Sequence, residues 1–374
     1  MADRIVAPPA LLSLRDRPIT AVGPVRMYVC GITPYAVTHL GHAATYLWAD
    51  AAARVLASAG HAVHMARNVT DVDDVLYAEA DRRGQEPTLF GALQRASFDM
   101  TMATLRVRTP DHQPTAAQAV GQVIRLATVL LAVGAAYERS GTVYARTADA
   151  AADLDRATAL ALAAEYRDDP DDPAKDDPLD VAVWRSAGSL ERPVPVWPSP
   201  WGEGRPGWHA GCAAMVLAHY GPGLDVHCGG ADLAYPHHAC EAALAEAATG
   251  VRPFAQHWLR AGIVRLDGEK MAKSSGNLVL VDDLLREHPP AAVRLLCLNR
   301  PYGQSWDYRP GLLDDASAVL EQLYSAAGKP AAGRPAPRLQ AALLDDLDVP
   351  AAVQVALDEG GATARALIDV LALS

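Results

Sequence analysis

The sequence predicts an α/β protein built on a parallel sheet, and three observations near its start support this fold class. Residues 25–31 (VRMYVCG) form a short, apolar, β-rich run. Residues 43–59 are rich in alanine, place their larger apolar side chains at helical spacing, and end at Gly60. Residues 61–69 return to a strand pattern. A strand, a helix and a strand in this order begin a parallel sheet.

The composition limits the class of protein. The chain has 374 residues, enough for one large or two ordinary domains with substantial cores. Hydrophobic residues make up 50% of it and charged residues 21%, the balance of a globular enzyme. The net charge of −11, from 44 acidic and 33 basic side chains, gives no overall basic field to attract a polyanion. Nucleic acid is therefore not the expected partner, although a local basic patch would be enough to bind it.

The termini and the cysteines suggest where the protein works. Residues 1–4 (MADR) begin no signal-like segment, and the most apolar later stretch, residues 123–136, is interrupted by Arg125. We expect a cytoplasmic protein without a membrane segment. The five cysteines are scattered and odd in number, which favours thiols or metal ligands over disulfides.

The middle and the end of the chain differ in character from its start. Residues 113–204 combine helical patterns, a hairpin around residues 141–144, an acidic proline-rich stretch (RDDPDDPAKDDP) and WPSPWGEGRPG, which together are typical of a surface insertion. A second α/β portion begins at Trp208. Residues 328–337 have the composition of a linker, and residues 339–373 are predicted to be Ala/Leu-rich helix.

His39 and His42 belong to a His-Leu-Gly-His motif between the first strand and the first helix. Both imidazoles are expected near the first helical turn, where free backbone N–H groups and the helix dipole favour phosphate. In isolation, two capping or core histidines would be the commoner explanation. The position directly after CGITPY favours a phosphate site instead.

Lys270 and Lys273 lie in the polar segment DGEKMAKSSGN, which is too hydrophilic for a core. A loop that carries two lysines can close over a nucleotide and neutralise charge in the transition state of attack at a phosphate. A solvated basic turn is the alternative, and for an isolated lysine pair it would be preferred.

A metal site is plausible from the residues but not demanded by them. Cys30, Cys212, His237 and Glu241 show no CxxC spacing. His237 and Glu241 are four residues apart and share one face if the segment after Pro236 is helical, and His238 could replace His237 on spacing alone. A buried structural cysteine is the commoner fate of a single cysteine.

Longer motifs extend along nearly the whole chain, and together they are specific. They include MYVCGITPY, THLGHAATYL, NVTDVDD, KDDPLDVAVW, WPSPWGEGRPGWH, GGADL, DGEKMAKSSGNLVLV and DDLDVPAA. In these motifs the chain resembles class I cysteinyl-tRNA synthetases and, more closely, their tRNA-independent relatives, the cysteine ligases of mycothiol biosynthesis, which join cysteine to glucosaminyl-inositol.

The resemblance implies a class I aminoacyl-tRNA synthetase-like Rossmann (HUP) fold with five parts. These are the first half of the catalytic domain (1–112), a connective insertion (113–204), the second half of the catalytic domain (205–262), a stem-contact domain with the KMAKS loop (263–327) and a helical C-terminal region (328–374).

The resemblance also implies roles for individual residues. It makes the chain an AMP-forming ligase that uses ATP with Mg²⁺, holds Zn²⁺, and acts on cysteine and an amine. Zinc would favour cysteine over serine, because a thiolate is the better ligand. The implied groups are His39, His42, Lys270 and Lys273 for catalysis; Gly41, His42, Gly230, Met271 and Lys273 for the nucleotide; Thr33, Thr70, Trp208 and Asp232 for cysteine; and Cys30, Cys212, His237 and Glu241 for zinc.

Three departures from the family pattern keep alternatives open. Ala272 replaces the usual serine of the lysine loop, Gly211-Cys212-Ala213 replaces Glu-Cys-Ser, and Ala239 follows His238. A different acceptor amine, as in a secondary-metabolite pathway, is one alternative, and it is open whether Glu241 binds metal. A cysteinyl-tRNA synthetase is another, although only about a hundred residues follow the lysine loop and no basic anticodon-binding domain is evident. A catalytically silent paralogue is disfavoured, because both histidines and both lysines are present.

Overall fold

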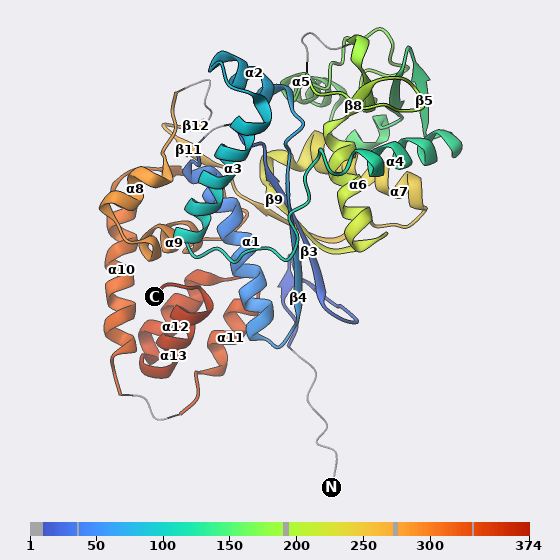
Figure 1. Ribbon diagram of the computed structural model, residues 1–374. Helices are drawn as coiled ribbons and strands as arrows, with labels where there is room; N and C mark the ends of the chain where they lie inside the picture. Colours follow the sequence, from blue (N-terminus) through green and yellow to red (C-terminus); the bar gives the residue numbers. More distant parts are fainter. Residues whose placement is uncertain (1–9, 36, 190–193, 272–275, 331–332) are drawn as a thin grey trace.

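The computed structural model describes residues 10–35, 37–189, 194–271, 276–330 and 333–374. Figure 1 shows a central sheet with one long helix against it, a smaller lobe at one end, and a group of helices at the side. The predicted α/β fold class is confirmed.

The central sheet has four parallel strands in the order β10-β9-β3-β4. The first half of the chain supplies β3 and β4, and the second half supplies β9 and β10. The order in which strands are added to the sheet therefore reverses between β3 and β9. Ligands of open α/β sheets bind at the carboxyl ends of the strands at such a point. The strands are β3 (Val25–Ile32), β4 (Val63–Val69), β9 (Leu224–Gly230) and β10 (Ala255–Ala261).

Helix α1 (Leu40–Ser58) links β3 to β4 and confirms the strand, helix, strand unit expected from the sequence. Its small alanines let the helix pack closely on the sheet, and Leu47, Trp48 and Leu56 fill the core there. The crossover helix α7 (Ala239–Thr249) joins β9 to β10, and α6 (Trp208–Tyr220) leads into β9. Two short segments, η3 (Ala231–Leu233) and the π-helical η4 (Ala234–His238), lie between β9 and α7.

Two further helices follow β4, and a small hairpin precedes β3. These elements are α2 (Asp74–Arg82), α3 (Pro87–Thr104), β1 (Ser13–Leu14) and β2 (Arg17–Pro18). In Figure 1, α2 and α3 run along the edge of the central sheet above α1.

The segment expected to be an insertion forms the lobe drawn in green in Figure 1. Its four strands form an antiparallel sheet in the order β5-β6-β7-β8, and the hairpin expected around residues 141–144 is confirmed. Trp184 of this sheet packs with Ala210 of α6 and Leu244 of α7, so the lobe shares a core with the catalytic half. The elements are α4 (Val120–Ala132), β5 (Ala136–Arg139), β6 (Thr142–Ala145), η1 (Ala148–Ala151), α5 (Arg156–Glu165), β7 (Val181–Ser186), η2 (Ala187–Ser189) and β8 (Gly204–Pro206).

A third sheet and the last helices complete the chain. The sheet has the order β12-β11-β13. Its strands are β11 (Val264–Leu266), β12 (Glu269–Lys270) and β13 (Trp306–Tyr308), and the helices are α8 (Val281–Glu287), α9 (Pro290–Leu298), α10 (Gly311–Ala327), α11 (Pro337–Leu344), α12 (Val349–Glu359) and α13 (Gly361–Val370).

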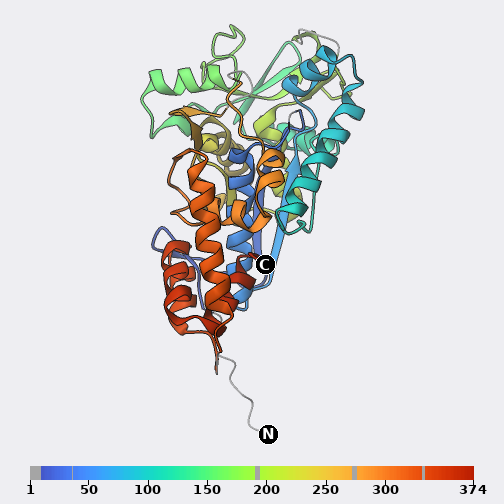
Figure 2. The same cartoon turned by 90° about the vertical axis from the view of Figure 1, so that its left-hand side faces the viewer.

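The Ala/Leu-rich helical character expected of residues 339–373 is confirmed, but the helix is interrupted twice. The segment is divided into α11, α12 and α13, because Asp346 and Leu347 adopt positive φ and Gly360 turns the chain at φ 61°. Figure 2 shows these red helices stacked beside α10 at the end of the molecule away from the green lobe. The domain boundaries themselves stay a prediction.

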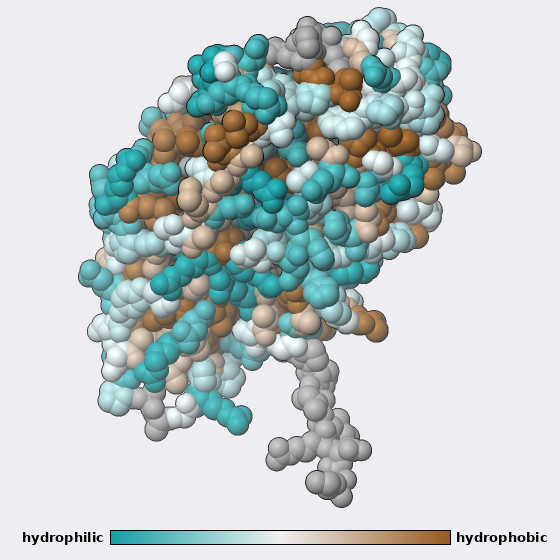
Figure 3. All heavy atoms as spheres, viewed as in Figure 1, coloured by the Kyte–Doolittle hydropathy of each residue, from teal (hydrophilic) through white to brown (hydrophobic). Residues whose placement is uncertain are grey.

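The surface is mixed in character. Figure 3 shows hydrophilic and hydrophobic residues interspersed over the face seen in Figure 1. None of the helices in the described ranges has both the length and the apolar character needed to cross a bilayer.

Candidate active site

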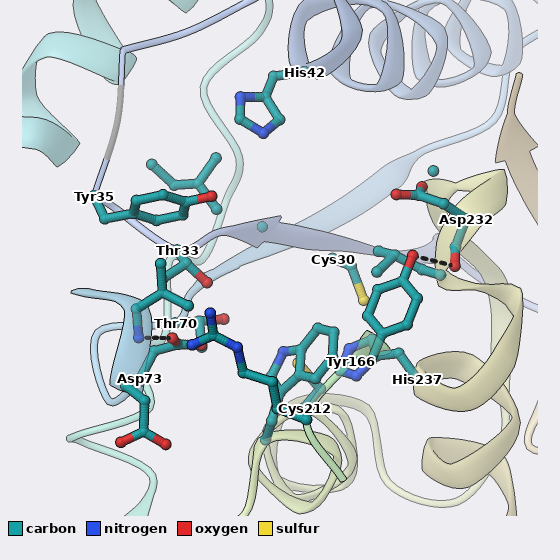
Figure 4. A pocket seen from close by; sticks show the side chains of 18 of the residues that line it. Cys30, Thr33, Tyr35, His42, Thr70, Asp73, Tyr166, Cys212, Asp232 and His237 are labelled. Atoms are coloured by element: carbon teal, nitrogen blue, oxygen red, sulfur yellow. Dashed lines mark hydrogen bonds between the residues drawn. The ribbon is translucent and has the colours of Figure 1, made fainter. Parts of the chain in front are cut away.

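A cavity of about 880 Å³ lies at the carboxyl ends of β3 and β9. The parallel sheet, the first turn of α1, the end of α5, the start of α6 and β12 all contribute to its wall. Most residues singled out in the sequence line it: Cys30, Thr33, His39, Gly41, His42, Thr70, Trp208, Cys212, Gly230, Asp232, His237, Lys270 and Met271. Figure 4 shows Cys30, Cys212 and His237 gathered together, with His42 apart from them across the pocket.

The structure brings the residues that follow the DGEKMAKSSGN segment against the His-Leu-Gly-His motif. The backbone N–H of Leu40 donates to the carbonyl of Val279 at 2.8 Å, and the N–H of Val281 donates to the carbonyl of Thr38 at 3.1 Å. The segment after the lysine loop is thus fixed against the start of α1. Lys273 and Ala272 lie outside the described residues, whereas Lys270 and Met271 belong to the cavity wall.

His39 and His42 stack at the start of α1, with ring centroids 3.8 Å apart. Burial lowers the pKa of His39 to about 3, helped by the neighbouring His42, and burial together with Lys270 lowers the pKa of His42 to about 4. Both rings are therefore neutral at pH 7. Within the described chain, Nδ1 of His39 is buried without a hydrogen-bond partner. A neutral imidazole donates one N–H, so the pair suits phosphate oxygens.

Lys270 reaches across the cavity to Asp232. Its Nζ lies 2.6 Å from Asp232 Oδ2 and 3.4 Å from the hydroxyl of Tyr166. Burial lowers the pKa of Lys270, but the attraction of Asp232 outweighs it, and the pKa is raised overall. The lysine is therefore a permanent cation at physiological pH. Gly230 makes room for this pair, because a Cβ there would lie 2.3 Å from Asp232 Oδ1 and would displace the carboxylate.

Thr70 and Trp208 occupy the part of the cavity expected to hold the amino acid. Asn68 accepts from the backbone N–H of Gly31 at 2.7 Å and donates to Thr70 Oγ1 at 3.1 Å, which fixes the threonine. The indole of Trp208 stacks on His237 at 4.1 Å between ring centroids. Thr33 also lies on the cavity wall (Figure 4).

Four buried side chains converge where the cavity meets α6 and α7. One ligand atom from each of Cys30, Cys212, His237 and Glu241 lies within 4.8 Å of all the others. The expectation that His237 and Glu241 share a face is confirmed, since His237 Nε2 lies 3.6 Å from Glu241 Oε2. Burial raises the pKa of the Cys30 thiol, with Cys212 adding to the effect.

The chemistry of this cluster fits a zinc ion. Two sulfurs, one imidazole and one carboxylate are a donor set typical of tetrahedral zinc. Glu241 is fully buried, and among the described residues no lysine or arginine pairs with it. A buried carboxylate without a cation is costly, so a divalent ion would relieve this cost.

A second possible metal group overlaps the first. Cys30, His227, His238 and Glu241 also satisfy the distance criterion, and His227 Nε2 lies 3.3 Å from Glu241 Oε2. The sequence analysis considered His238 but missed His227, which lies within β9. Its only signal was a histidine within the strand LDVHCGG, and Asp225 makes that strand polar at a second position.

The lobe contributes residues that the sequence analysis missed. Tyr166 follows α5 and donates to the Asp232 carbonyl at 3.0 Å (Figure 4). Its ring stacks on Trp208. Asp168 lies 3.0 Å from His209 Nε2, and His209 in turn contacts His237. No motif in the sequence marks Tyr166 or Asp168, because their proximity to the cavity depends on how the lobe folds back.

Residues 18–318 match the family model described as tRNA synthetases class I (C) catalytic domain. The chain belongs to this family. Within it, the chain is 46% identical over 357 residues to the L-cysteine:1D-myo-inositol 2-amino-2-deoxy-alpha-D-glucopyranoside ligase of Mycolicibacterium vanbaalenii, covering 91% of this chain and 82% of that relative. It is 44% identical to the enzyme of the same name from Rhodococcus jostii, covering 96% and 91%.

Solved structures of class I synthetases share the fold. The methionyl-tRNA synthetase of Mycobacterium tuberculosis, solved with methionyl-adenylate, superposes with a TM-score of 0.67 at 16% identity, covering 93% of this chain and 84% of that one. The arginyl-tRNA synthetase of Thermus thermophilus superposes with a TM-score of 0.51 at 18% identity, covering 98% and 75%. At these identities the likeness establishes the fold alone.

Proposed function

We propose that this class I synthetase-family enzyme activates L-cysteine with ATP and transfers the cysteinyl group to the amine of glucosaminyl-inositol. The observation that carries this proposal is a single cavity that holds the stacked histidines, Lys270 and the buried sulfur cluster. The relatives named for this reaction cover most of the chain at 44–46% identity.

In the first step, a carboxylate oxygen of cysteine attacks the α-phosphorus of ATP. The bond to the bridging oxygen breaks, and pyrophosphate leaves with its Mg²⁺. His39 and His42 donate N–H groups to the phosphates at the start of α1, and the Lys270 ammonium neutralises charge that develops on the leaving group. Gly41, Gly230 and Met271 line the same space. Preorganised donors of this kind contribute most where charge develops.

Cys30, Cys212, His237 and Glu241 would hold a zinc ion at the other end of the cavity. When bound, zinc supplies a Lewis acid that selects a thiolate over the hydroxyl of serine. Asp232 binds the amino group of cysteine, while Thr33, Thr70 and Trp208 enclose the rest of the molecule.

In the second step, the acceptor amine attacks the carbonyl carbon of cysteinyl adenylate. The bond to the AMP oxygen breaks, the amide forms, and the nitrogen loses a proton. The cavity wall also includes Asp73, Arg82 and Arg205. Such a polar wall suits an acceptor with many hydroxyl groups, and holding both reactants there supplies much of the rate.

Pyrophosphate exchange in zinc-loaded protein tests the first step. We expect exchange with cysteine and almost none with serine. Lys270→Ala should reduce the exchange rate by about 10²–10³-fold, as for loss of one preorganised group. Lys329→Ala, an exposed lysine outside the cavity, is the matched control. Exchange that is absent, or equal with serine, would contradict the proposal.

A further inference from the structure

Asp168 lies in a loop that several contacts hold in place beside the cluster of Cys30, Cys212, His237 and Glu241. The backbone N–H of Asp168 donates to the carbonyl of Ala163 at 2.9 Å. The ammonium of Lys175 donates to the backbone carbonyl of Asp168. The residues on either side, Arg167 and Asp169, have φ of 62° and 51°. Non-glycine residues rarely adopt this backbone conformation, and it persists only where the surroundings fix it.

The Asp168 carboxylate begins a chain of hydrogen bonds that ends at the cluster. Both of its oxygens lie 3.0 Å from His209 Nε2. His209 Nδ1 lies 2.8 Å from His237 Nδ1. The other nitrogen of His237, Nε2, lies 3.6 Å from Glu241 Oε2 and faces the cluster. Asp168 is 13% exposed, and both histidines are 1% exposed.

Elementary hydrogen bonding then determines where the protons are. A carboxylate only accepts, so His209 carries a proton on Nε2, and in the neutral imidazole its Nδ1 is left with a lone pair. The contact between the two Nδ1 atoms needs one proton, which His237 must supply. His237 is therefore protonated on Nδ1, and its Nε2 presents a lone pair to the cluster. Stacking of Trp208 on His237 holds the ring in this plane.

We propose that Asp168 is a positioning residue that, through His209, fixes the His237 tautomer able to ligate a metal at Nε2. The inference rests on the proposed function, because it assigns His237 to a zinc site. Because Asp168 belongs to the lobe, the lobe then contributes to metal affinity without supplying a metal ligand. Partners that orient a ligating histidine in this way typically change metal affinity by about 10–100-fold when removed.

Zinc affinity is the first test, measured by competition with a chromophoric chelator. Asp168→Ala should weaken zinc binding about 10–100-fold. Asp171→Ala, an exposed aspartate of the same stretch, removes the same charge without touching His209 and should leave affinity unchanged. His209→Ala should weaken binding as well, and adding Asp168→Ala to it should cause no further loss, because the aspartate acts through the histidine. Unchanged affinity in Asp168→Ala, or additive losses, would overturn the inference.

The tautomer itself is the second test and needs no metal. Nitrogen NMR of zinc-free protein labelled at histidine should show His237 protonated on Nδ1 in the wild type and a mixture of tautomers in Asp168→Ala. The His237 signals are identified by their loss in His237→Gln. An unchanged tautomer in Asp168→Ala would overturn the inference even if the enzyme makes cysteinyl adenylate. A wild-type protein that binds no zinc would instead refute the metal assignment in the proposed function.

Discussion

The ammonium group of Lys270 lies 2.6 Å from the carboxylate of Asp232. This ion pair joins β12 to the segment η3 that follows β9. Asp232 is also the residue that we assign to the amino group of cysteine. The ammonium of the substrate would therefore compete with Lys270 for one carboxylate, and its arrival would release Lys270 toward the phosphates.

Asp232→Asn should raise the KM for cysteine about 10–100-fold in pyrophosphate exchange. The variant loses a hydrogen bond between charged groups, which is worth about 1.5–3 kcal/mol. Asp267→Asn is the control, since it is exposed and lies three residues from Lys270. A KM for cysteine that stays at the wild-type value in Asp232→Asn would remove this carboxylate from substrate binding.

The buried histidine pair should make stability depend on pH. The folded protein keeps His39 and His42 neutral down to pH about 3 and about 4, whereas in the unfolded chain their ordinary pKa is 6.5. The unfolded state therefore binds more protons between these values, and the free energy of unfolding falls as pH falls from about 6.5 toward 4. Above 6.5 their contribution is complete.

Urea unfolding at pH 7 and pH 5 tests this dependence. On acidification, wild type should lose more stability than the double variant His39→Asn, His42→Asn, by up to about 2 kcal/mol for each histidine. Comparing the two proteins cancels the contributions of other groups. Equal losses in both would mean that these rings are protonated alike in the folded and unfolded states.

Much of the fold could be predicted because its signals are local. Each signal lies within a short stretch of sequence: the apolar run of β3, the alanine pattern of α1 and the strand pattern of β4. The structure contains all three elements. The last segment divides at two points. The break at Asp346 and Leu347 contains no glycine or proline, whereas the break at Gly360 and Gly361 carries a glycine pair whose meaning was overlooked.

The site residues that belong to a sequence motif could be predicted, whereas those that only tertiary packing brings to the cavity could not. His39, Lys270 and the cluster cysteines belong to recognisable family motifs. Asp168 and Tyr166 lie in or beside a proline-rich stretch that resembled exposed loop, and only the packing of the lobe on α6 brings them to the cavity. Long-range placement of this kind leaves no periodicity in the sequence.

The zinc assignment predicts a selective effect of Cys30→Ser. Removing a partner that only orients a ligand typically weakens metal binding by about 10–100-fold, and losing the Cys30 thiolate itself should weaken zinc binding by more. The variant should also show a smaller preference for cysteine over serine. Cys297→Ser makes the same change at a fully buried cysteine outside the cluster. Metal analysis and exchange assays report both effects. Full zinc occupancy with unaltered selectivity in Cys30→Ser would refute the assignment.

The buried ion pair of Arg294 and Asp50 should matter for stability rather than for catalysis. Both side chains are 0% exposed, and Arg294 also donates to the carbonyls of Leu105 and Leu371, joining α1 to the end of the chain. Arg294→Met should lower the free energy of unfolding by about 3 kcal/mol, because Asp50 then keeps only its partly exposed partner Arg54. Arg286→Met, in an exposed pair, should cost at most about 1 kcal/mol. Similar losses in both variants would contradict this account.

Product formation by zinc-loaded wild type, followed by mass spectrometry, tests the central claim most directly. With ATP, cysteine and glucosaminyl-inositol, we predict an amide of cysteine and the amino sugar, with one AMP released per amide. With ATP, cysteine and tRNA, we predict no cysteinyl-tRNA. Cysteinyl-tRNA without the amide would contradict the account.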